Sequence, residues 1–261
     1  MRALLEKFSV HMNVFNQERI IRVYLPVSYQ EGENNYPVLY MHDGQNVFDD
    51  SEAIGGVSLK LKSYLDKNEL DVIVVVIDQN SEERFNEYSP WVDGEYVKKL
   101  LGQASSLGGK GKQYMDFIVH ELKPLIDEKY RTKKDYTAMA GISLGGLITT
   151  YAACKYPEIF KHIIIFSSAF YRNQEDIENL IKESDLSLIE SFYMDCGTRE
   201  GGESENDNIC REFLTTNQRV YNILREKLPT TRFEIIKNAS HGYVYFKERR
   251  AELFTFVKKI R

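Results

Sequence analysis

Residues 137–153 read TAMAGISLGGLITTYAA, and this stretch carries the strongest structural signal in the chain. An apolar run typical of a strand enters the turn, and a run typical of a helix leaves it. A Gly-x-Ser-x-Gly turn between a strand and a helix is the pattern of a nucleophile elbow. Small neighbours make room for a strained serine, and we expect Gly141 and Gly145 to supply that room. Ser143 is therefore the candidate nucleophile.

The rest of the chain alternates short apolar runs with amphipathic segments, which indicates a mostly parallel sheet with helices on both faces. Residues 4–12 and 19–24 predict an antiparallel start. Buried strands are predicted at residues 37–41, 72–77, 137–140, 163–166, 192–194 and 233–236. Apolar runs of this length, rich in Val and Ile, fit strands that are covered on both sides. We predict an α/β fold in which residues 1–261 form a single domain.

Helices are predicted from three- and four-residue spacing of apolar side chains. The clearest spans residues 112–130, and Pro124 should bend or end it locally. The others are expected at residues 173–183, at 213–224, and from about residue 245 to 257.

Composition excludes several classes of function. The chain has 261 residues, a formal net charge of −5 and no run of Lys and Arg, which argues against a nucleic-acid partner. It has no stretch of roughly 18 apolar residues and no signal-peptide pattern at its start, so we expect a cytoplasmic protein without a membrane partner. Cys154, Cys196 and Cys210 show no CxxC spacing, which predicts neither a disulfide framework nor a zinc site.

Serine is a weak nucleophile at neutral pH and needs a base. In an α/β hydrolase the chain order is serine, acid, histidine. Only His162 and His241 follow Ser143. His241 comes directly after the last predicted strand, where a loop would hold an imidazole over the nucleophile, so it is the expected base. His162 opens a strand and is interpreted as a packing or solvated residue.

The acid should follow the penultimate strand, where residues 195–207 offer several carboxylates. Glu200 lies nearest the expected strand end and is preferred, with Asp207 as the alternative. Asp195 is expected to lie within the strand, and most of the remaining carboxylates are expected to be solvated.

An oxyanion hole needs two backbone N–H groups, and Leu144, the residue after the nucleophile, should supply one. The loop after the third strand, HDGQNVF at residues 42–48, should supply the other. Gln45 is the preferred donor and Gly44 the next. His42 and Asp43 in the same loop lack a third ligand nearby, so we predict no metal site.

At this point the sequence resembles the esterase family of α/β hydrolases that includes esterase D, feruloyl and acetyl-xylan esterases, enterochelin esterases and mycolyltransferases. The matching segments are YPVLYMHDGQN at 36–46, RFNEYSP at 84–90, AGISLGG at 140–146, KYPEIF at 155–160, GTRE at 197–200 and the region of His241. The resemblance implies an α/β-hydrolase fold without a separate lid domain. The family's Gly-Thr-x-Asp acid position falls on Glu200, a glutamate in place of aspartate.

These features together predict a serine carboxylic-ester hydrolase that acts on a small polar ester, such as an acylated sugar or a siderophore trilactone, without metal or organic cofactor. An acyltransferase or thioesterase with the same triad is the alternative, and a catalytically silent binding protein with the same fold is the second. A homo-oligomer is left open. Aromatic residues expected at the cleft, as a stacking platform or as ordinary packing, are Phe48, Tyr88, Trp91, Phe170, Tyr171 and Tyr243.

Overall fold

A central sheet runs through the computed structural model, which describes residues 2–103, 105–202 and 208–257. Within these residues the sheet has eight strands in the order β1-β2-β4-β3-β5-β6-β7-β8. β1 pairs with β2, and β2 with β4, in antiparallel register, and all other pairs are parallel. The strands are β1 (Leu4–Met12), β2 (Gln17–Leu25), β3 (Tyr36–Met41), β4 (Ile73–Ile77), β5 (Thr132–Ile142), β6 (His162–Phe166), β7 (Ser191–Arg199) and β8 (Arg232–Ser240).

Burial explains why these segments are strands. Every residue of β3, β4 and β6 is buried, as expected for Val- and Ile-rich strands covered on both faces. All the predicted strands are present, and the antiparallel start is confirmed. The predicted burial of residues 233–236 is wrong, because β8 is the edge strand of the sheet and Ile235 is 52% exposed. β5 and β8 are longer than predicted, because their polar ends, from Thr132 and up to Ser240, continue the pairing beyond the apolar runs.

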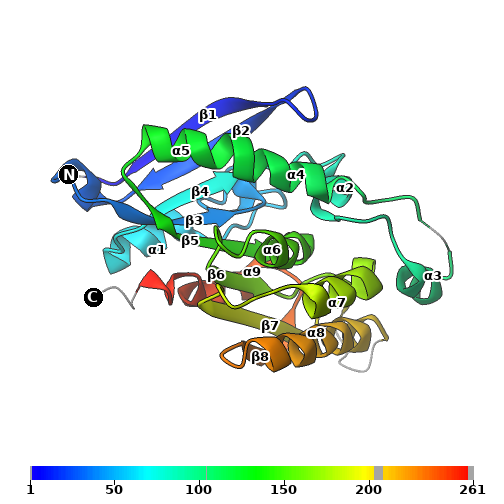
Figure 1. Ribbon diagram of the computed structural model, residues 1–261. Coiled ribbons are helices and arrows are strands. Elements are labelled where there is room, and N and C mark those ends of the chain that lie inside the picture. The colour runs from blue at the N-terminus through cyan, green and yellow to red at the C-terminus, as the bar shows by residue number, and fades with distance from the viewer. Residues whose placement is uncertain (1, 104, 203–207, 258–261) are drawn as a thin grey trace.

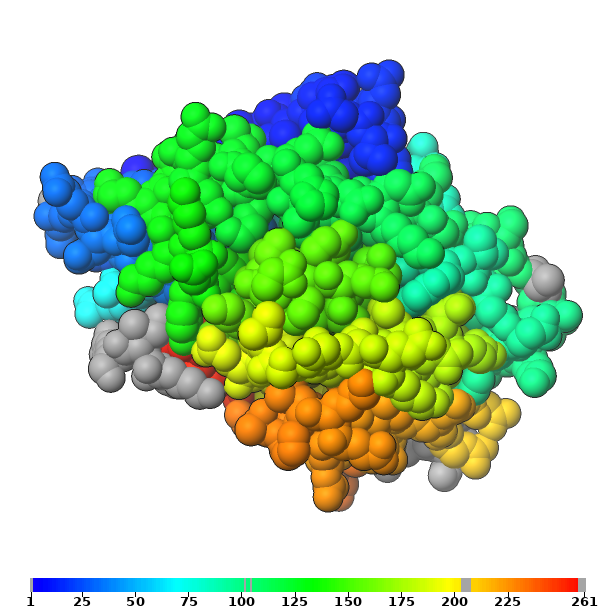
Figure 2. All heavy atoms as spheres, in the orientation of Figure 1, coloured from blue at the N-terminus to red at the C-terminus, as the bar shows by residue number. Residues whose placement is uncertain are grey.

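Helices cover both faces of the sheet (Figure 1). One face carries α4 (Gly111–Phe117), α5 (Lys123–Lys129), α6 (Leu144–Lys155), α7 (Gln174–Glu183) and α8 (Asn208–Lys227), which hide most of the sheet in Figure 2. The other face packs against α1 (Leu61–Asn68), α9 (Tyr243–Arg249) and the 3-10 turn η5 (Arg250–Phe254). Successive residues of a strand point to opposite faces of the sheet. Met139 packs in the core under α4–α8, and Ala138 packs in the core under α1, α9 and η5. This arrangement is the α/β-hydrolase fold.

Helix boundaries depart from prediction in three places. The helix predicted at 112–130 consists of α4, a π-helical turn η3 (Ile118–Leu122) and α5. The π turn ends just before Pro124, which has no N–H to continue an α-helical ladder. The last helix starts at Tyr243 and becomes 3-10 after Arg249. The prediction missed α1, α2 (Arg84–Tyr88) and α3 (Glu95–Leu101), which have too few turns for a clear apolar stripe.

Candidate active site

Ser143 occupies a sharp turn between β5 and α6. Its backbone has φ 61° and ψ −121°, a left-handed conformation that costs a residue with a Cβ. The Ser143 N–H donates to the Phe166 carbonyl at 3.0 Å, and its carbonyl accepts the N–H groups of Gly146 and Ala169, each at 3.0 Å. These hydrogen bonds hold the strained serine at the carboxyl edge of the sheet.

Glycines around the turn are required to different degrees. A Cβ added at Gly141 would lie 2.0 Å from the Gly145 carbonyl oxygen, so the prediction that Gly141 makes room for the turn is confirmed. A Cβ at Gly145 would lie 3.5 Å from its nearest neighbour, His42 Cβ, which is an ordinary contact. The same expectation for Gly145 is therefore wrong. The second crowded glycine is Gly146, where a Cβ would come within 2.9 Å of Ser168.

His241 and Glu200 lie together at the ends of two neighbouring strands. His241 follows β8, Glu200 follows β7, and His241 Nδ1 is 2.6 Å from Glu200 Oε2. Glu200 Oε1 accepts the Gly197 N–H at 2.6 Å and the Ser167 hydroxyl at 2.5 Å. Burial alone would raise the pKa of Glu200, but the hydrogen bond and charge of the His241 imidazole, together with the Ser167 and Gly197 donors, hold it below its ordinary value. Glu200 is thus a buried, ionised carboxylate.

The segment that follows β6 connects this pair to the elbow. The Phe166 carbonyl binds Ser143 N–H, the Ser167 hydroxyl donates to Glu200, and Ala169 N–H donates to the Ser143 carbonyl. Ser143, Glu200 and His241 therefore follow the carboxyl ends of the parallel strands β5, β7 and β8, and the segment at the end of β6, the strand between β5 and β7, links the elbow to the Glu200–His241 pair. Ser167 was missed by the sequence analysis, because nothing in its local pattern distinguishes it.

The structure describes two of the three other residues that the sequence analysis weighed. Asp207, the alternative acid, lies outside the described residues. Asp195 lies within β7, as predicted, and accepts a hydrogen bond of 2.7 Å from Arg249. His162 is fully buried and packs against the Tyr136 ring with 4.8 Å between ring centroids. The packing interpretation of His162 is confirmed.

The loop after β3 is anchored at its first residues. Asp43 has φ 58°, and its N–H donates to Tyr88 Oη at 3.1 Å. Its carboxylate accepts two hydrogen bonds from Arg84, at 2.7 and 2.9 Å. Gly44 lies so close to the end of β4 that a Cβ would approach Asp78 Oδ1 to 2.4 Å. This packing constraint is the structural reason for a glycine at position 44.

Gln45 belongs to the short 3-10 turn η2 (Gly44–Asn46). Its side-chain amide donates to the Gln79 carbonyl and accepts the Gln79 N–H, both at 2.9 Å. The first N–H groups of a helical turn have no partner within that turn, so those of Gly44 and Gln45 face outward from it. The N–H group of Leu144, the first residue of α6, likewise has no partner within its own helix. The loop reaches the elbow, since His42 is the nearest neighbour of a Cβ at Gly145.

His42 and Asp43 have partners unlike those of a metal pair. His42 Nδ1 is 2.9 Å from Tyr114 Oη, and burial lowers the pKa of His42 to about 4. Asp43 is held by Arg84. Within the part of the chain that the structure describes, no group of three or more His, Cys, Asp or Glu side chains could hold a metal ion.

The six aromatic residues expected at the cleft divide into two groups. Phe48, Tyr88 and Phe170 are buried and serve as packing residues. The other three are partly exposed, namely Trp91, Tyr171 and Tyr243. Only this second group could contact a substrate.

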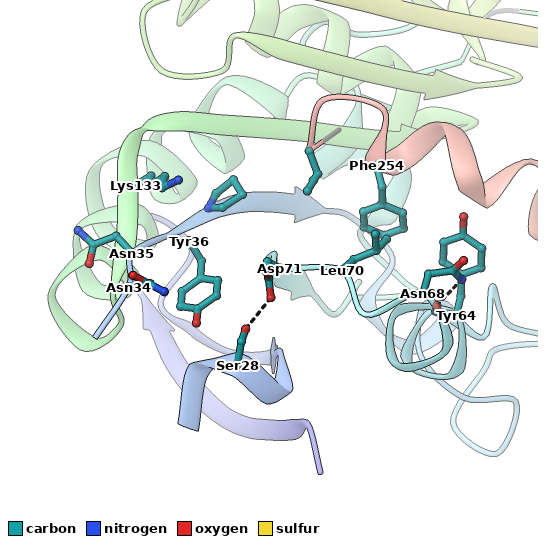
Figure 3. A pocket seen from close by; sticks show the side chains of 12 residues that line it. Ser28, Asn34, Asn35, Tyr36, Tyr64, Asn68, Leu70, Asp71, Lys133 and Phe254 are labelled. Atoms are coloured by element: carbon teal, nitrogen blue, oxygen red, sulfur yellow. Dashed lines mark hydrogen bonds between the residues drawn. The ribbon is translucent and has the colours of Figure 1, made fainter. Parts of the chain in front are cut away.

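A cavity of about 620 Å³ lies elsewhere (Figure 3). Tyr36 and Pro37, at the start of β3, and Lys133, at the start of β5, contribute to its wall. These residues belong to the amino ends of parallel strands, whereas Ser143, Glu200 and His241 lie at the carboxyl ends. The cavity is therefore separate from the candidate site. None of the described helices is long and apolar enough to cross a membrane.

Comparison with known proteins adds a family and a set of similar folds. The family model described as "Putative esterase" matches residues 12–255. The uncharacterized protein YbbA of Bacillus subtilis is 29% identical over 237 residues, which cover 87% of this chain and 88% of YbbA. A ferulic acid esterase structure superimposes with a TM-score of 0.73 and 19% identity, covering all of both chains. The siderophore hydrolase EstB of Aspergillus nidulans has a TM-score of 0.74 and 18% identity, covering 98% of this chain and 96% of EstB.

Proposed function

The chain belongs to the esterase family whose model matches residues 12–255, and we propose that it hydrolyses carboxylic esters with Ser143 as the nucleophile. The observation that carries the proposal is the combination of a strained serine elbow with a hydrogen-bonded pair, buried Glu200 and partly exposed His241, at the ends of β7 and β8. Unrelated serine hydrolases share this set of roles, which is recognised by geometry.

The proposed reaction has two halves. Ser143 Oγ attacks the ester carbonyl carbon while His241 Nε2 takes the hydroxyl proton, and His241 then gives that proton to the leaving alkoxide. Water, deprotonated by His241, attacks the acyl-serine in the same way and releases the acid. Glu200 holds Nδ1–H of His241 and stabilises the imidazolium formed in each half.

Negative charge develops on the carbonyl oxygen in both halves. The Leu144 N–H, at the amino end of α6, is one proposed donor to this oxygen. The Gln45 N–H is the other, with Gly44 as its alternative in the same turn. The anchoring of Asp43 by Arg84 and Tyr88 supports a loop that is rigid before substrate binds, as an oxyanion hole requires.

The proposed substrate is a polar ester. Trp91, Tyr171 and Tyr243 are partly exposed aromatic residues that also carry polar groups, and the Arg84 side chain is 21% exposed. Two proteins of similar fold are described as a ferulic acid esterase and a siderophore hydrolase. A panel of acetylated sugars, feruloyl esters, catecholate trilactones and S-formylglutathione tests this proposal. Cleavage of long-chain lipid esters alone would contradict it.

The nucleophile is tested with a short p-nitrophenyl ester and a fluorophosphonate probe. We expect turnover and labelling in the wild-type protein and neither in Ser143→Ala. Ser187→Ala, at an exposed position between α7 and β7, is the matched control and should behave as wild type. Equal turnover by wild type and Ser143→Ala would refute the serine mechanism.

A further inference from the structure

A buried ion pair lies on the α9 side of the sheet, close to the Glu200–His241 pair. Asp195 in β7 is completely buried, and Arg249, the last residue of α9, is 8% exposed. Arg249 Nη1 donates to Asp195 Oδ1 at 2.7 Å. The proposed reaction gives neither residue a role.

Stability alone does not account for this pair. Among the described residues, Arg249 Nε and Nη2 are buried without a hydrogen-bond partner. Removing two charges from water is expensive, and a pair with incomplete hydrogen bonding recovers that cost poorly. Well-packed apolar residues would stabilise the fold at least as well. The contacts of the pair suggest a different role.

Arg249 lies against the rings of two residues that contact the candidate site, Phe246 through its ring and Phe166 through its backbone. Its guanidinium carbon is 5.0 Å from the Phe246 ring centroid and 5.5 Å from that of Phe166. The Phe246 ring packs edge-on against the His241 imidazole, with 5.4 Å between centroids and 89° between planes. The Phe166 carbonyl accepts the Ser143 N–H. The Arg249 side chain therefore contacts one residue that packs against His241 and one that hydrogen-bonds to Ser143.

Asp195 is linked to Glu200, the third residue of the candidate site, through Ser167. Its carbonyl accepts the Ser167 N–H at 2.9 Å, and the Ser167 hydroxyl donates to Glu200. Its carboxylate also meets Tyr193 Oη at 3.3 Å. The charged groups near Asp195 are Arg249 of α9 and Glu200 of the loop after β7, and Tyr193 Oη links it to Glu234 of β8.

We propose that Asp195 and Arg249 are positioning residues for the ester hydrolysis proposed above, on which this inference rests. The pair ties α9 to β7 and so holds the His241 imidazole, through Phe246, in line with Glu200 and Ser143. It also keeps the charge of Arg249, which lies across the Phe246 ring from the imidazole, paired with a carboxylate while the imidazole gains and loses its own charge in each turnover.

The test removes one charge at a time and follows the pH profile of kcat/KM. Asp195→Asn leaves the positive charge of Arg249 without its carboxylate partner. That unpaired charge disfavours the imidazolium form of His241, so the inflection moves to lower pH. Arg249→Met leaves Asp195 buried without a cation; because burial already raises the pKa of this carboxyl to about 7, Asp195 is then protonated, and the inflection stays near its wild-type position. We therefore expect a downward shift of about half to one pH unit for Asp195→Asn alone. In both variants kcat should fall about tenfold or more, with KM within about twofold, as for lost transition-state interactions.

Two further variants protect the test against simple misfolding. The double variant Asp195→Asn/Arg249→Met removes both charges, so its inflection should return to the wild-type position while kcat stays low. Arg250→Met is the matched control, because the neighbouring Arg250 stacks on the Tyr64 ring at 4.9 Å and donates to the Leu59 carbonyl. It should leave kcat, KM and the inflection unchanged.

The outcomes separate this inference from the proposed function. Folded single variants that keep the wild-type inflection and a kcat within about twofold would overturn the positioning role. If the single variants do not fold, a double variant with wild-type kcat overturns it, and one with low kcat, normal KM and normal inflection supports it. Equal turnover by wild type and Ser143→Ala would refute the proposed function, and the inference with it.

Discussion

Replacing Glu200 with Gln should disable the base by reversing the imidazole tautomer. Glu200 Oε1 accepts the Gly197 N–H and the Ser167 hydroxyl, and Oε2 faces His241 Nδ1. A glutamine has one oxygen, which stays with the two donors, so its NH₂ group faces His241. Two donors cannot face each other, and Nδ1 must then become the acceptor. The proton moves to Nε2, which can no longer accept the proton of Ser143.

The size of the effect follows from this geometry. The side chain of Glu200 is completely buried, so water does not replace the lost charge. An amide in place of the carboxylate, in a serine–histidine–acid set with intact geometry, lowers kcat about 10⁴-fold, or about 5 kcal/mol of transition-state stabilisation. We expect a loss of about 10³- to 10⁴-fold in kcat for Glu200→Gln, with KM little changed.

Steady-state hydrolysis of p-nitrophenyl acetate between pH 5 and 9 measures this loss. In the wild type, kcat/KM should rise with pH and then level, because the base must be neutral. Glu226→Gln, exposed on α8, is the control and should match the wild type. Activity of Glu200→Gln within about tenfold of wild type would refute the reasoning. If Asp207→Asn abolished activity instead, Asp207 would be the acid.

Three further predictions concern the turns and the pH dependence of stability. Gly141→Ala should lower Tm by roughly 5–10 °C, because its Cβ meets a backbone oxygen at 2.0 Å, whereas Gly145→Ala should stay within a few degrees of wild type in the same thermal scan. Gly44→Ala should push the loop away from Asp78 and reduce kcat about 10²- to 10³-fold, as for the loss of one oxyanion donor, with a folded protein by circular dichroism. The pKa of Glu200 is held below its ordinary value of 4.5 in the folded protein. Its contribution to the free energy of unfolding is therefore present above pH 4.5 and disappears as the pH falls through the folded-state pKa. The urea midpoints of the wild type and Glu200→Gln should converge as the pH is lowered.

Much of the candidate site could be predicted because its signals are local. A Gly-x-Ser-x-Gly turn between a strand and a helix identifies Ser143 within a few residues of sequence. Strand ends then restrict the acid and the base, because the carboxyl ends of parallel strands meet at one edge of the sheet. Glu200 and His241 each follow a strand directly, and the structure brings their side chains together at 2.6 Å.

Contacts between distant residues could not be read in the same way. Arg84 lies 41 positions from Asp43, and Arg249 lies 54 from Asp195, and no local pattern marks either pair. The glycine positions show the same limit, since Gly145 and Gly146 look equivalent in sequence and only the approach of Ser168 makes the second one crowded.

Sequence alone therefore specified the layered α/β architecture and the turn that bears Ser143, because both depend on hydrophobic periodicity and on the local conformational freedom of glycine. Tertiary structure alone decided which buried charges meet. Ion pairs such as Asp195–Arg249 form only when separate strands and helices pack, and their partners depend on the three-dimensional distance between side chains.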